Sequence, residues 1–428
     1  METTILILAL LSFVIWIILL LLRGQFWRAD QRLSDTQVPL SHFPSVTVIV
    51  PARNEAEFIG TSLKSILNQN YPGMEKVILI DDGSSDGTAG IAQKTAAILN
   101  RTDKLNIIKS QSLPIGWTGK LWAMEQGIRY AQSLKVPPDY FLFTDADIEH
   151  SPHNLMELME KSEAEQYQMV SLMVMLRCKS FWEKLLIPAF VFFFQKLYPF
   201  RWVNDPKIQF AAAAGGCILI RREALTRIGG LQILKDTLID DCTLAQAVKG
   251  TSSTLSQNGT HTAINSGFSF VKVAFPLKSK SLNPIWLGLT EKTRSLRHYS
   301  NLSGIWSMVA RTAFTQLNYS IVLLGLTLLG MILIYLIPPF GFIWGMLTGR
   351  GLITLLSALA LVSMGVAYRP TLKLYLVSPI FGLALPVIGF YYCIMTLDSA
   401  VKYWQGKGGS WGGRTYHKLK GNESMPNL

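Results

Sequence analysis

Residues 77–88 read VILIDDGSSDGT, an apolar run of four residues that passes directly into acids and small residues. Such a run bounded by turn formers is typical of a buried β-strand, and the Asp, Gly and Ser that follow favour a turn. A helix is predicted next, from Asp86 to Leu99, with Thr88 near its start. The stretch therefore predicts a strand, a polar turn and a helix in direct succession.

The same succession repeats on both sides of this stretch. Strands are predicted at 46–50, 105–108 and 140–144, and helices at 55–70 and 120–134. Because strands alternate with helices, the predicted fold class is α/β with a mostly parallel sheet. Ligands bind such sheets beyond the carboxyl ends of the strands. Polar clusters follow three of these ends, namely Arg53-Asn54-Glu55, Asp81-Asp82, and Asp145 with Asp147.

The composition indicates a membrane protein. Of the 428 residues, 49% are hydrophobic and only 16% are charged, whereas soluble proteins carry about 25% charged residues. The apolar content excludes intrinsic disorder, and its concentration near the two ends argues against a purely soluble enzyme. The net charge of +12 is also found in nucleic-acid-binding proteins. Much of this charge flanks apolar segments, so a membrane surface and not nucleic acid is the predicted partner.

The four cysteines lie far apart and form no CxxC pair. This spacing excludes a disulfide scaffold and a cysteine zinc site, and it fits a reducing compartment.

An uncharged segment at the start of the chain, Ile5–Leu22, is just long enough to cross a bilayer. A signal peptide is the alternative, but the chain lacks a basic n-region and an A-x-A cleavage site. Arg23, Arg28 and Arg32 follow directly, and the positive-inside rule then predicts that the next segment is cytoplasmic. Residues 23–318 are therefore expected to form a cytoplasmic domain of a multi-pass protein of the cell (inner) membrane.

Three further uncharged segments predict two to three spans within residues 319–397: 320–337, 351–368 and 374–397. Three spans would put the basic tail, residues 398–428, outside the cell, whereas its charge favours the inside. The last segment is broken by Pro379 and Pro386, so it is the candidate for a re-entrant or interfacial segment.

Two segments of the domain depart from the regular alternation. Ile187–Phe200 is apolar and aromatic but too short and too interrupted to cross a membrane. It is expected either at the membrane interface or as an ordinary core helix. Thr251–Lys280 is rich in Ser, Thr, Asn and Gly and is expected to be a flexible surface insertion.

The acid pair Asp145-Ala146-Asp147 ends a predicted strand. Two carboxylates one residue apart can both reach one hard divalent cation, Mg²⁺ or Mn²⁺, which also takes phosphate oxygens as ligands. Such an ion would neutralise a leaving diphosphate. A D-x-D sequence alone is more often a solvated turn, but its position after two other polar strand ends favours a metal site.

Asp81 and Asp82 lie at the matching end of an earlier strand. A carboxylate there can accept hydrogen bonds from a nucleobase N–H or a ribose hydroxyl. Capping of the next helix is the simpler interpretation, and it accounts for Asp86 and Thr88 without needing two consecutive acids. The turn that contains Pro51, Arg53 and Glu55 occupies the equivalent place after the first strand.

Two more charged pairs follow later in the chain. Asp240 and Asp241 lie between apolar neighbours, so each should raise the pKa of the other, and one could serve as a general base. A plain helix N-terminus is the alternative. Arg294 and Arg297 would share one face of a helix and could bind a diphosphate. They could equally be a basic membrane flank.

Taken together, these motifs resemble the family 2 glycosyltransferases with a GT-A fold, which is a Rossmann-like nucleotide-sugar domain. The resemblance covers residues 44 to 300 and rests on VIVPARNEAE, DDGSSDGT, the D-x-D pair, the later acid pair and a Q/R-x-x-R-W-type motif. More narrowly, the chain resembles the hopene-associated branch, and it is also similar to carotenoid-modifying and ceramide glucosyltransferases. The stretches that carry this narrower likeness are Gly116–Ala123, Ala211–Arg222, Ile239–Ala245 and Arg311–Leu317.

The resemblance implies a membrane-bound inverting glycosyltransferase that moves a sugar from a UDP-sugar to a lipid acceptor. A hopanoid or another isoprenoid or sphingolipid-like lipid is the implied acceptor, and Mg²⁺ or Mn²⁺ is the implied cofactor. Asp241 would be the catalytic base beside Asp240, Asp82 would face the uracil, and Asp145 and Asp147 would hold the metal. The implied nucleotide-sugar-binding residues are Pro51, Arg53, Glu55, Asp81, Asp82, Lys120, Asp145, Arg294 and Arg297.

Two rival functions follow from the same motifs. A processive polysaccharide synthase is disfavoured because His298 replaces the usual Trp of the Q-x-x-R-W motif. A non-catalytic membrane transport or scaffold protein could use the same fold. That class would tolerate loss of the acids, yet Asp82, Asp145, Asp147 and Asp241 are all present. The predicted spans also lack the charge that transport usually requires.

Overall fold

The computed structural model describes residues 2–33, 40–235, 237, 240–250 and 282–407, together with the backbone at 410, 411, 414 and 415. The predicted flexible insertion at 251–280 lies outside the described residues.

The predicted alternation of strands and helices is confirmed, and the structure adds the bounds of each element. The strands are β1 (Val46–Ala52), β2 (Met74–Asp81), β3 (Leu105–Lys109), β4 (Tyr140–Thr144), β5 (Ile148–Glu149), β6 (Met169–Met175), β7 (Cys217–Arg221), β8 (Ile285–Ser295), β9 (Ser410–Trp411) and β10 (Arg414–Thr415). The helices of the sheet domain are η1 (Phe26–Arg28), α2 (Ile59–Leu67), α3 (Thr88–Ile98), η2 (Thr102–Lys104), α4 (Gly119–Gln132), α5 (Asn154–Ala164), α6 (Phe181–Leu197), α7 (Phe200–Asn204), α8 (Arg222–Arg227), η3 (Gly230–Leu234) and α9 (Asp240–Lys249). The terminal helices are α1 (Glu2–Leu22), α11 (Leu302–Gln316), α12 (Ile321–Met331), η4 (Ile332–Leu336), α13 (Ile337–Thr348), α14 (Gly351–Leu374), η5 (Pro379–Ala384) and α15 (Leu385–Trp404).

The main sheet has the strand order β3-β2-β1-β4-β7-β6-β8-β5. Strands β3, β2, β1 and β4 are parallel to one another. Strand β7 is antiparallel to both of its neighbours, β4 and β6, whereas β6 and β8 are parallel. The expected α/β fold with a mostly parallel sheet is thus confirmed, and the sheet becomes mixed beyond β4.

Both faces of this sheet are buried, which explains why its central strands are continuous apolar runs. Every residue of β1 is buried. Because successive side chains of a strand point to opposite faces, Val48 and Val50 pack on the side of α2, α3 and α5, and Ile49 packs on the side of α4. The polar turns at the carboxyl ends of β1, β2 and β4 therefore project from a rigid scaffold.

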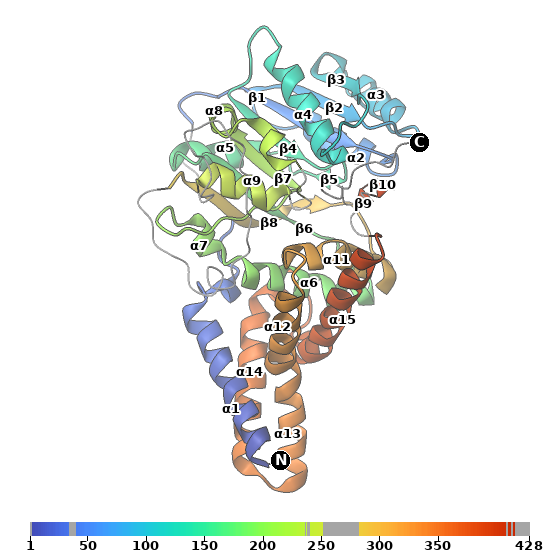
Figure 1. The fold of residues 1–428 in the computed structure, drawn as a ribbon. Coiled ribbons are helices and arrows are strands. Elements are labelled where there is room, and N and C mark those ends of the chain that lie inside the picture. Colours follow the sequence, from blue (N-terminus) through green and yellow to red (C-terminus); the bar gives the residue numbers. More distant parts are fainter. Residues whose placement is uncertain are drawn as a thin grey trace, which may run out of the picture.

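Four helical segments are long and apolar enough to cross a membrane: Glu2–Leu22, Ile321–Thr348, Gly351–Leu374 and Pro379–Trp404. They agree in place with the four predicted segments. In Figure 1 the sheet domain lies above these helices, and the end of α1 that carries Glu2 lies at the opposite end of the molecule. There Glu2 forms an ion pair with Arg350 at 2.7 Å.

The second of these segments is continuous through α12, η4 and α13, and it contains a π-helical turn at η4. Pro338 has no N–H to donate to the carbonyl of Ile334 four residues earlier. That carbonyl instead accepts a hydrogen bond from the indole nitrogen of Trp16 in α1 at 3.0 Å. The proline thus creates the point at which α1 is joined to this span.

The last apolar segment packs differently from the other three. The indole of Trp306 in α11 donates to Asp398 at 2.7 Å, and Ser399 accepts a hydrogen bond from the backbone of Phe314, also in α11. Figure 1 shows α15 beside α11 and α12, close to the sheet domain, whereas α13 lies at the far end of the molecule. The preceding helix α14 also reaches the sheet-domain side, where Tyr368 packs on Phe192. The last segment thus packs against α11 at the sheet-domain end of the apolar helices.

Helix α6 lies at the junction between the sheet domain and the apolar helices (Figure 1). It contains most of the predicted Ile187–Phe200 segment and ends at Leu197, before Pro199 and the short helix α7. The carbonyl of Leu186 accepts a hydrogen bond from Tyr392 of α15 at 3.0 Å. The segment is therefore a buried helix that joins the two parts of the molecule.

Candidate functional site

The turns after β1 and β2 are held together by side-chain and backbone hydrogen bonds. The backbone N–H groups of Glu55 and Ala56 donate to Thr88 and Asp86, each at 2.9 Å. Asn54, in the left-handed region at φ 55°, accepts from the backbone N–H of Ser85 at 2.9 Å. The N-cap of α3 is Gly87, which makes no side-chain cap hydrogen bond, although Asp86 accepts from the backbone N–H of Thr88, the first residue of the helix, at 3.1 Å. Asp86 and Thr88 thus mainly fix the turn that carries Arg53 and Glu55.

Asp82 is buried at the end of β2, and Arg53 donates to both its backbone carbonyl and its carboxylate. Asp81 accepts from the backbone N–H of Ser84 at 3.1 Å. Pro51 lies in β1, in register with Ile80 of β2. The predicted nucleotide-binding residues of the first two strands therefore meet at one edge of the sheet.

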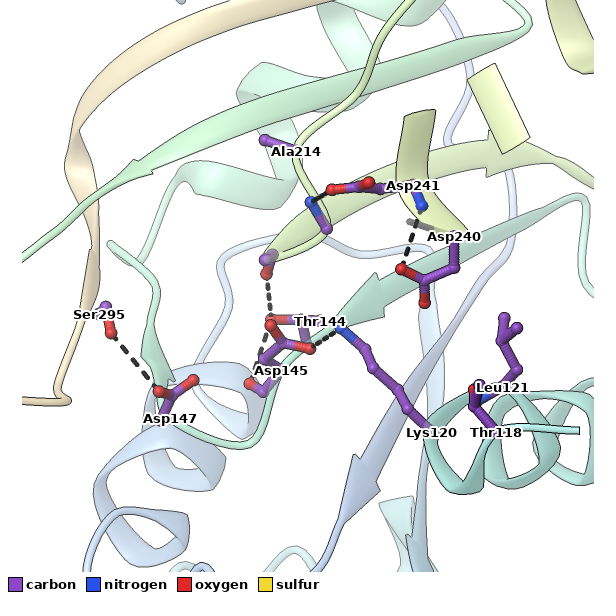
Figure 2. A network of polar contacts seen from close by, with 12 residues as sticks. Thr118, Lys120, Leu121, Thr144, Asp145, Asp147, Ala214, Asp240, Asp241 and Ser295 are labelled. Carbon is purple, nitrogen blue, oxygen red and sulfur yellow. Dashed lines mark hydrogen bonds and ion pairs between the residues drawn. The ribbon is translucent and has the colours of Figure 1, made fainter. Parts of the chain in front are cut away.

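The end of β4 carries the first carboxylate of the D-x-D pair. Asp145 forms an ion pair with Lys120, with 2.6 Å between Oδ1 and Nζ. Lys120 lies in the first turn of α4, whose N-cap Thr118 accepts from the backbone N–H of Leu121. Figure 2 shows the lysine side chain extending from α4 to Asp145, with Asp240 on its other side. Burial lowers the pKa of Lys120, but the carboxylates of Asp145 and Asp240 together raise it above its ordinary value.

The second carboxylate of the pair is joined to another strand. Asp147 accepts from Nε of Arg297 at 2.8 Å, and Nη2 of Arg297 donates to both carboxylate oxygens of Glu55 at 2.8 Å. Burial raises the pKa of Asp147, and the neighbouring Asp145 raises it further. Burial also raises the pKa of Glu55, to about 7. Arg297 thus bridges the turns that follow β1 and β4.

Asp240 and Asp241 open helix α9, so the helix N-terminus considered for them is present. Asp241 does more than cap this helix, because its Oδ2 accepts from the backbone N–H of Gly215 at 2.9 Å. Its Oδ1 accepts from the backbone N–H of Cys242 at 2.7 Å. Burial and the adjacent Asp240 raise the pKa of Asp241 to about 6. A carboxylate with this pKa is suited to accept a proton near neutral pH.

The placement of Arg294 differs from the expectation. Arg294 and Arg297 were expected on one face of a helix, but Arg294 lies in strand β8 and Arg297 follows the end of that strand. Arg294 is exposed, opposite Glu149 in β5, and its Nε donates to the carbonyl of Glu291. Side chains alternate across a strand, so Thr293 and Ser295 point inward where Arg294 points outward. The structure therefore brings Arg297 into the cluster and leaves Arg294 outside it.

The donor set of the D-x-D pair fits a hard divalent cation. Within the part of the chain that the structure describes, no three His, Cys, Asp or Glu side chains are grouped to hold a metal ion by themselves. Two carboxylates, each already facing a cation of the protein, could supply part of the ligand set, with water and phosphate oxygens as the rest. The residues that would hold such an ion are Asp145 and Asp147.

Sequence reasoning missed the contacts made by backbone and neutral side chains. Gly215, whose N–H contacts Asp241, lies in the AAAAGGC stretch that was singled out only for its likeness to a family. Ser295 lies 3.5 Å from Asp147, and Thr144 donates to the carbonyl of Gly216 at 3.1 Å. Figure 2 shows the contact between Ser295 and Asp147. A lone Ser or Thr carries no distinguishing signal in a sequence.

Comparison with known proteins identifies the central part of the chain. Residues 47–229 match the family model described as Glycosyl transferase family 2. A 4,4'-diaponeurosporenoate glycosyltransferase of Staphylococcus aureus is 36% identical over 104 residues, which is 24% of each chain. The enzyme of the same name from Staphylococcus haemolyticus is 33% identical over 122 residues, 28% of this chain and 29% of its own length. The matched region therefore spans less than a third of either relative.

Among solved structures, a mannosyltransferase of Pyrobaculum calidifontis, in complex with GDP-Man and Mn²⁺, aligns with 94% of this chain and 99% of its own. Its TM-score is 0.48 and its sequence identity is 18%.

Proposed function

Because the chain carries a domain of glycosyl transferase family 2, we propose that it is a membrane-bound inverting glycosyltransferase that moves a sugar from a UDP-sugar to a lipid acceptor. The GT-A fold and the class of enzyme follow from the family match and the strand topology. The nucleotide, the acceptor and the roles of individual residues are the content of the proposal.

The observation that carries this proposal is the meeting of two acid pairs at one lysine. Lys120 contacts Asp145 at 2.6 Å, and its charge also acts on Asp240 and Asp241. A nucleotide diphosphate held near Asp145 would therefore lie beside a carboxylate of raised pKa. Sugar transfer requires this arrangement, because an acceptor hydroxyl must lose its proton while the diphosphate leaves.

On the donor side, each residue has a role that its chemistry supports. Asp82, buried and oriented by Arg53, is suited to accept hydrogen bonds from the uracil or the ribose. Lys120 and Arg297 are the cations that would meet the diphosphate charge. Mg²⁺ or Mn²⁺, when bound by Asp145 and Asp147, would supply further positive charge to the leaving diphosphate.

On the acceptor side, Asp241 removes the hydroxyl proton as the oxygen attacks C1 of the sugar. The new bond forms between the acceptor oxygen and C1, and the bond from C1 to the diphosphate oxygen breaks. A single displacement of this kind inverts the configuration at C1. Asp240 keeps the pKa of its neighbour raised, so that Asp241 can take the proton at neutral pH.

The surroundings of the acid pair support an acceptor that arrives from the membrane. Cys242, the residue after Asp241, is buried against the carbonyl of Ala213, and it contributes with burial to raising the pKa of Tyr198. Tyr198 follows α6 and donates to Gln316 of α11 at 2.8 Å. The end of α6 and helix α11 lie where the sheet domain meets the apolar helices. Through Tyr198 they thus approach Cys242, the residue after the proposed base.

The acceptor class is supported by composition and by the relatives. Four segments are apolar enough to cross a membrane, and the relatives in Staphylococcus are named as glycosyltransferases of 4,4'-diaponeurosporenoate. We infer an isoprenoid-type lipid acceptor, of which a hopanoid is one example. The catalytic domain is assigned to the cytoplasmic side of the cell membrane, because arginines at 23, 28 and 32 follow the first span.

The test is sugar transfer by the full-length protein in membranes that contain isoprenoid lipids. UDP-glucose and other UDP-sugars are supplied with Mn²⁺, and lipid extracts are analysed by mass spectrometry. The expected product is one lipid with a mass increase of one hexose, which is missing with Asp241→Asn. A sugar polymer would support the processive synthase, and UDP binding without any transfer would support the non-catalytic rival.

A further inference from the structure

A continuous chain of buried hydrogen bonds lies behind the candidate site and contains none of the predicted site residues. Thr293 of β8 donates to Oδ1 of Asn154 at 2.7 Å, and the Asn154 amide nitrogen lies 3.0 Å from Nδ1 of His150. Nε2 of His150 lies 2.9 Å from the hydroxyl of Thr144, which donates to the carbonyl of Gly216 at 3.1 Å. The side chains of Thr293, Asn154, His150 and Thr144 are all buried.

Which group donates in each hydrogen bond of this chain follows from the groups that can only donate or only accept. The Asn154 amide nitrogen can only donate, so Nδ1 of His150 accepts and carries no proton. In a neutral imidazole the proton is then on Nε2, which donates to Thr144. The Thr144 hydroxyl is left to donate to Gly216, whose carbonyl can only accept. Every donor in the chain therefore has an acceptor within it, and His150 is its central member.

The environment of His150 agrees with a neutral ring. Burial lowers the pKa of His150 to about 4, and the ring nitrogens hydrogen-bond with the neutral side chains of Thr144 and Asn154. The backbone N–H of His150 is held separately, by the hydroxyl of Ser65 at 3.0 Å. The ring thus has a fixed tautomer and a fixed position at neutral pH.

The chain joins the three segments that carry the proposed catalytic groups. Thr144 directly precedes Asp145. Gly216 follows Gly215, whose N–H holds Asp241 at 2.9 Å. Thr293 lies in β8, where Ser295 pairs with Ile148 of β5 and the backbone N–H of Leu296 donates to the carbonyl of Asp147 at 2.8 Å. Asp147 and Arg297 are therefore positioned by the same strand.

We propose that His150 is a positioning residue that holds the D-x-D turn in register with Asp241 and Arg297 through the Thr293–Asn154–His150–Thr144–Gly216 chain. This inference rests on the proposed function, because the readout is sugar transfer. Groups that act in one transition state must be held to within a fraction of an ångström. Partners one step removed from such groups typically change affinity or activity by about 10–100-fold when they are lost.

The first experiment compares His150→Gln with His150→Asn in the full-length protein. The amide nitrogen of Gln can take the place of Nε2 and donate to Thr144, whereas the shorter Asn can reach only the Asn154 side. His150→Gln should keep most of the turnover, and His150→Asn should lose about 10–100-fold in kcat. UDP affinity, measured by equilibrium binding, should fall less than kcat, because UDP alone does not require alignment with Asp241.

The matched control is Tyr140→Phe. Tyr140 is the first residue of β4, the strand that ends at Thr144. Its side chain is buried, and its hydroxyl hydrogen-bonds with Ser162 and Glu163. Its loss should lower the melting temperature and leave kcat per folded molecule unchanged. Equal kcat for the wild type, His150→Gln and His150→Asn would overturn the positioning role, and so would a loss of kcat that merely follows the loss of melting temperature.

A second comparison tests the chain as a unit. Thr293→Val removes the first donor of the chain. The double variant Thr293→Val with His150→Asn should be no slower than His150→Asn alone, because the effects of substituting residues that act as a unit do not add. Multiplicative losses would show that the two residues act separately and would overturn the proposal. If the wild type itself transfers no sugar, the proposed function fails instead, so the two failures are distinguishable.

Discussion

Arg297 donates from Nε to Oδ2 of Asp147 at 2.8 Å, across 150 positions of the sequence. The same guanidinium donates to Glu55, so one cation holds the turns that follow β1 and β4. Asp145, the other member of the D-x-D pair, is in turn paired with Lys120. Both carboxylates therefore already face a positive charge of the protein. Any divalent cation that binds them must share or displace these contacts.

The first prediction concerns the two carboxylates. Asp145→Asn and Asp147→Asn should each lower Mn²⁺-dependent transfer by about 10²–10³-fold, because each removes a carboxylate ligand of the cation that would neutralise the leaving diphosphate. Neither side chain belongs to the apolar core, so the melting temperature should change little. Transfer is measured in EDTA-treated membranes after Mn²⁺ is restored. Glu165→Gln, an exposed change at the end of α5, is the control, and near-normal transfer by either Asn variant would contradict the metal assignment.

The second prediction compares Arg297, which follows β8, with Arg294, which lies in that strand. Arg297→Lys keeps the charge but loses the planar fork that contacts Asp147 and Glu55 together. We expect transfer to fall by about 10²-fold. Arg294→Lys, on the exposed face of β8, should leave transfer near the wild-type rate. Initial rates at saturating UDP-sugar check both, and equal losses would mean that Arg294 also belongs to the site.

The first half of the fold could be predicted from sequence because its signals are local. Strand β4 was predicted with its observed bounds, Tyr140–Thr144, since four apolar and aromatic residues and Thr144 pass directly into a polar turn. Helix α2 was predicted from Glu55 but begins at Ile59. Its first residues are instead taken by the turn in which Asn54 adopts a positive φ. That turn depends on bonds to residues about 30 positions away.

The second half could not be predicted in the same way because its contacts are non-local. The i, i+3 spacing of Arg294 and Arg297 suggested a helix, yet pairing with β6 and β5 makes the segment a strand. Glu55 and Arg297 meet across 242 positions, and no pattern in either segment signals the other. The acids and the cations Lys120 and Arg297 could thus be named as candidates from the sequence, whereas the contacts between them and with backbone groups required the structure.

The third prediction concerns the last apolar segment. If α15 is re-entrant, its end lies on the same side of the membrane as the sheet domain, which also removes the conflict between the basic tail and a third C-terminal span. Cysteines are introduced singly at Lys407, at Thr348, the last residue of α13, and at Lys135 in the sheet domain as the control. A membrane-impermeant thiol reagent should label Thr348→Cys in intact cells and the other two only in inverted vesicles. Labelling of Lys407→Cys in intact cells would mean that α15 crosses the membrane.

The fourth prediction separates the two acids of α9. Asp241→Asn keeps the shape of the side chain but cannot take a proton, so transfer to the lipid should fall by about 10²–10⁴-fold. UDP binding should remain, because Asp82, Lys120 and Arg297 are unchanged. Asp240→Asn should cost less, since Asp240 acts on its neighbour's pKa. A slower Asp240→Asn, or loss of UDP binding in Asp241→Asn, would reverse the roles within this pair.

The last prediction is the pH dependence of transfer. Burial and the adjacent Asp240 raise the pKa of Asp241 to about 6. The base works only when it is ionised, so transfer should be retained above this pH and should fall by about tenfold per pH unit below it. Glu55, whose pKa is raised to about 7, titrates nearby and contacts Arg297, so the wild-type profile alone does not identify the group.

Asp240→Asn removes the like charge that raises the pKa of Asp241 and leaves its burial unchanged, so the acidic limb should move to lower pH. Glu55→Gln should lower the rate without moving that limb. A limb that moves with Glu55→Gln and not with Asp240→Asn would assign the profile to Glu55 and remove Asp241 as the base.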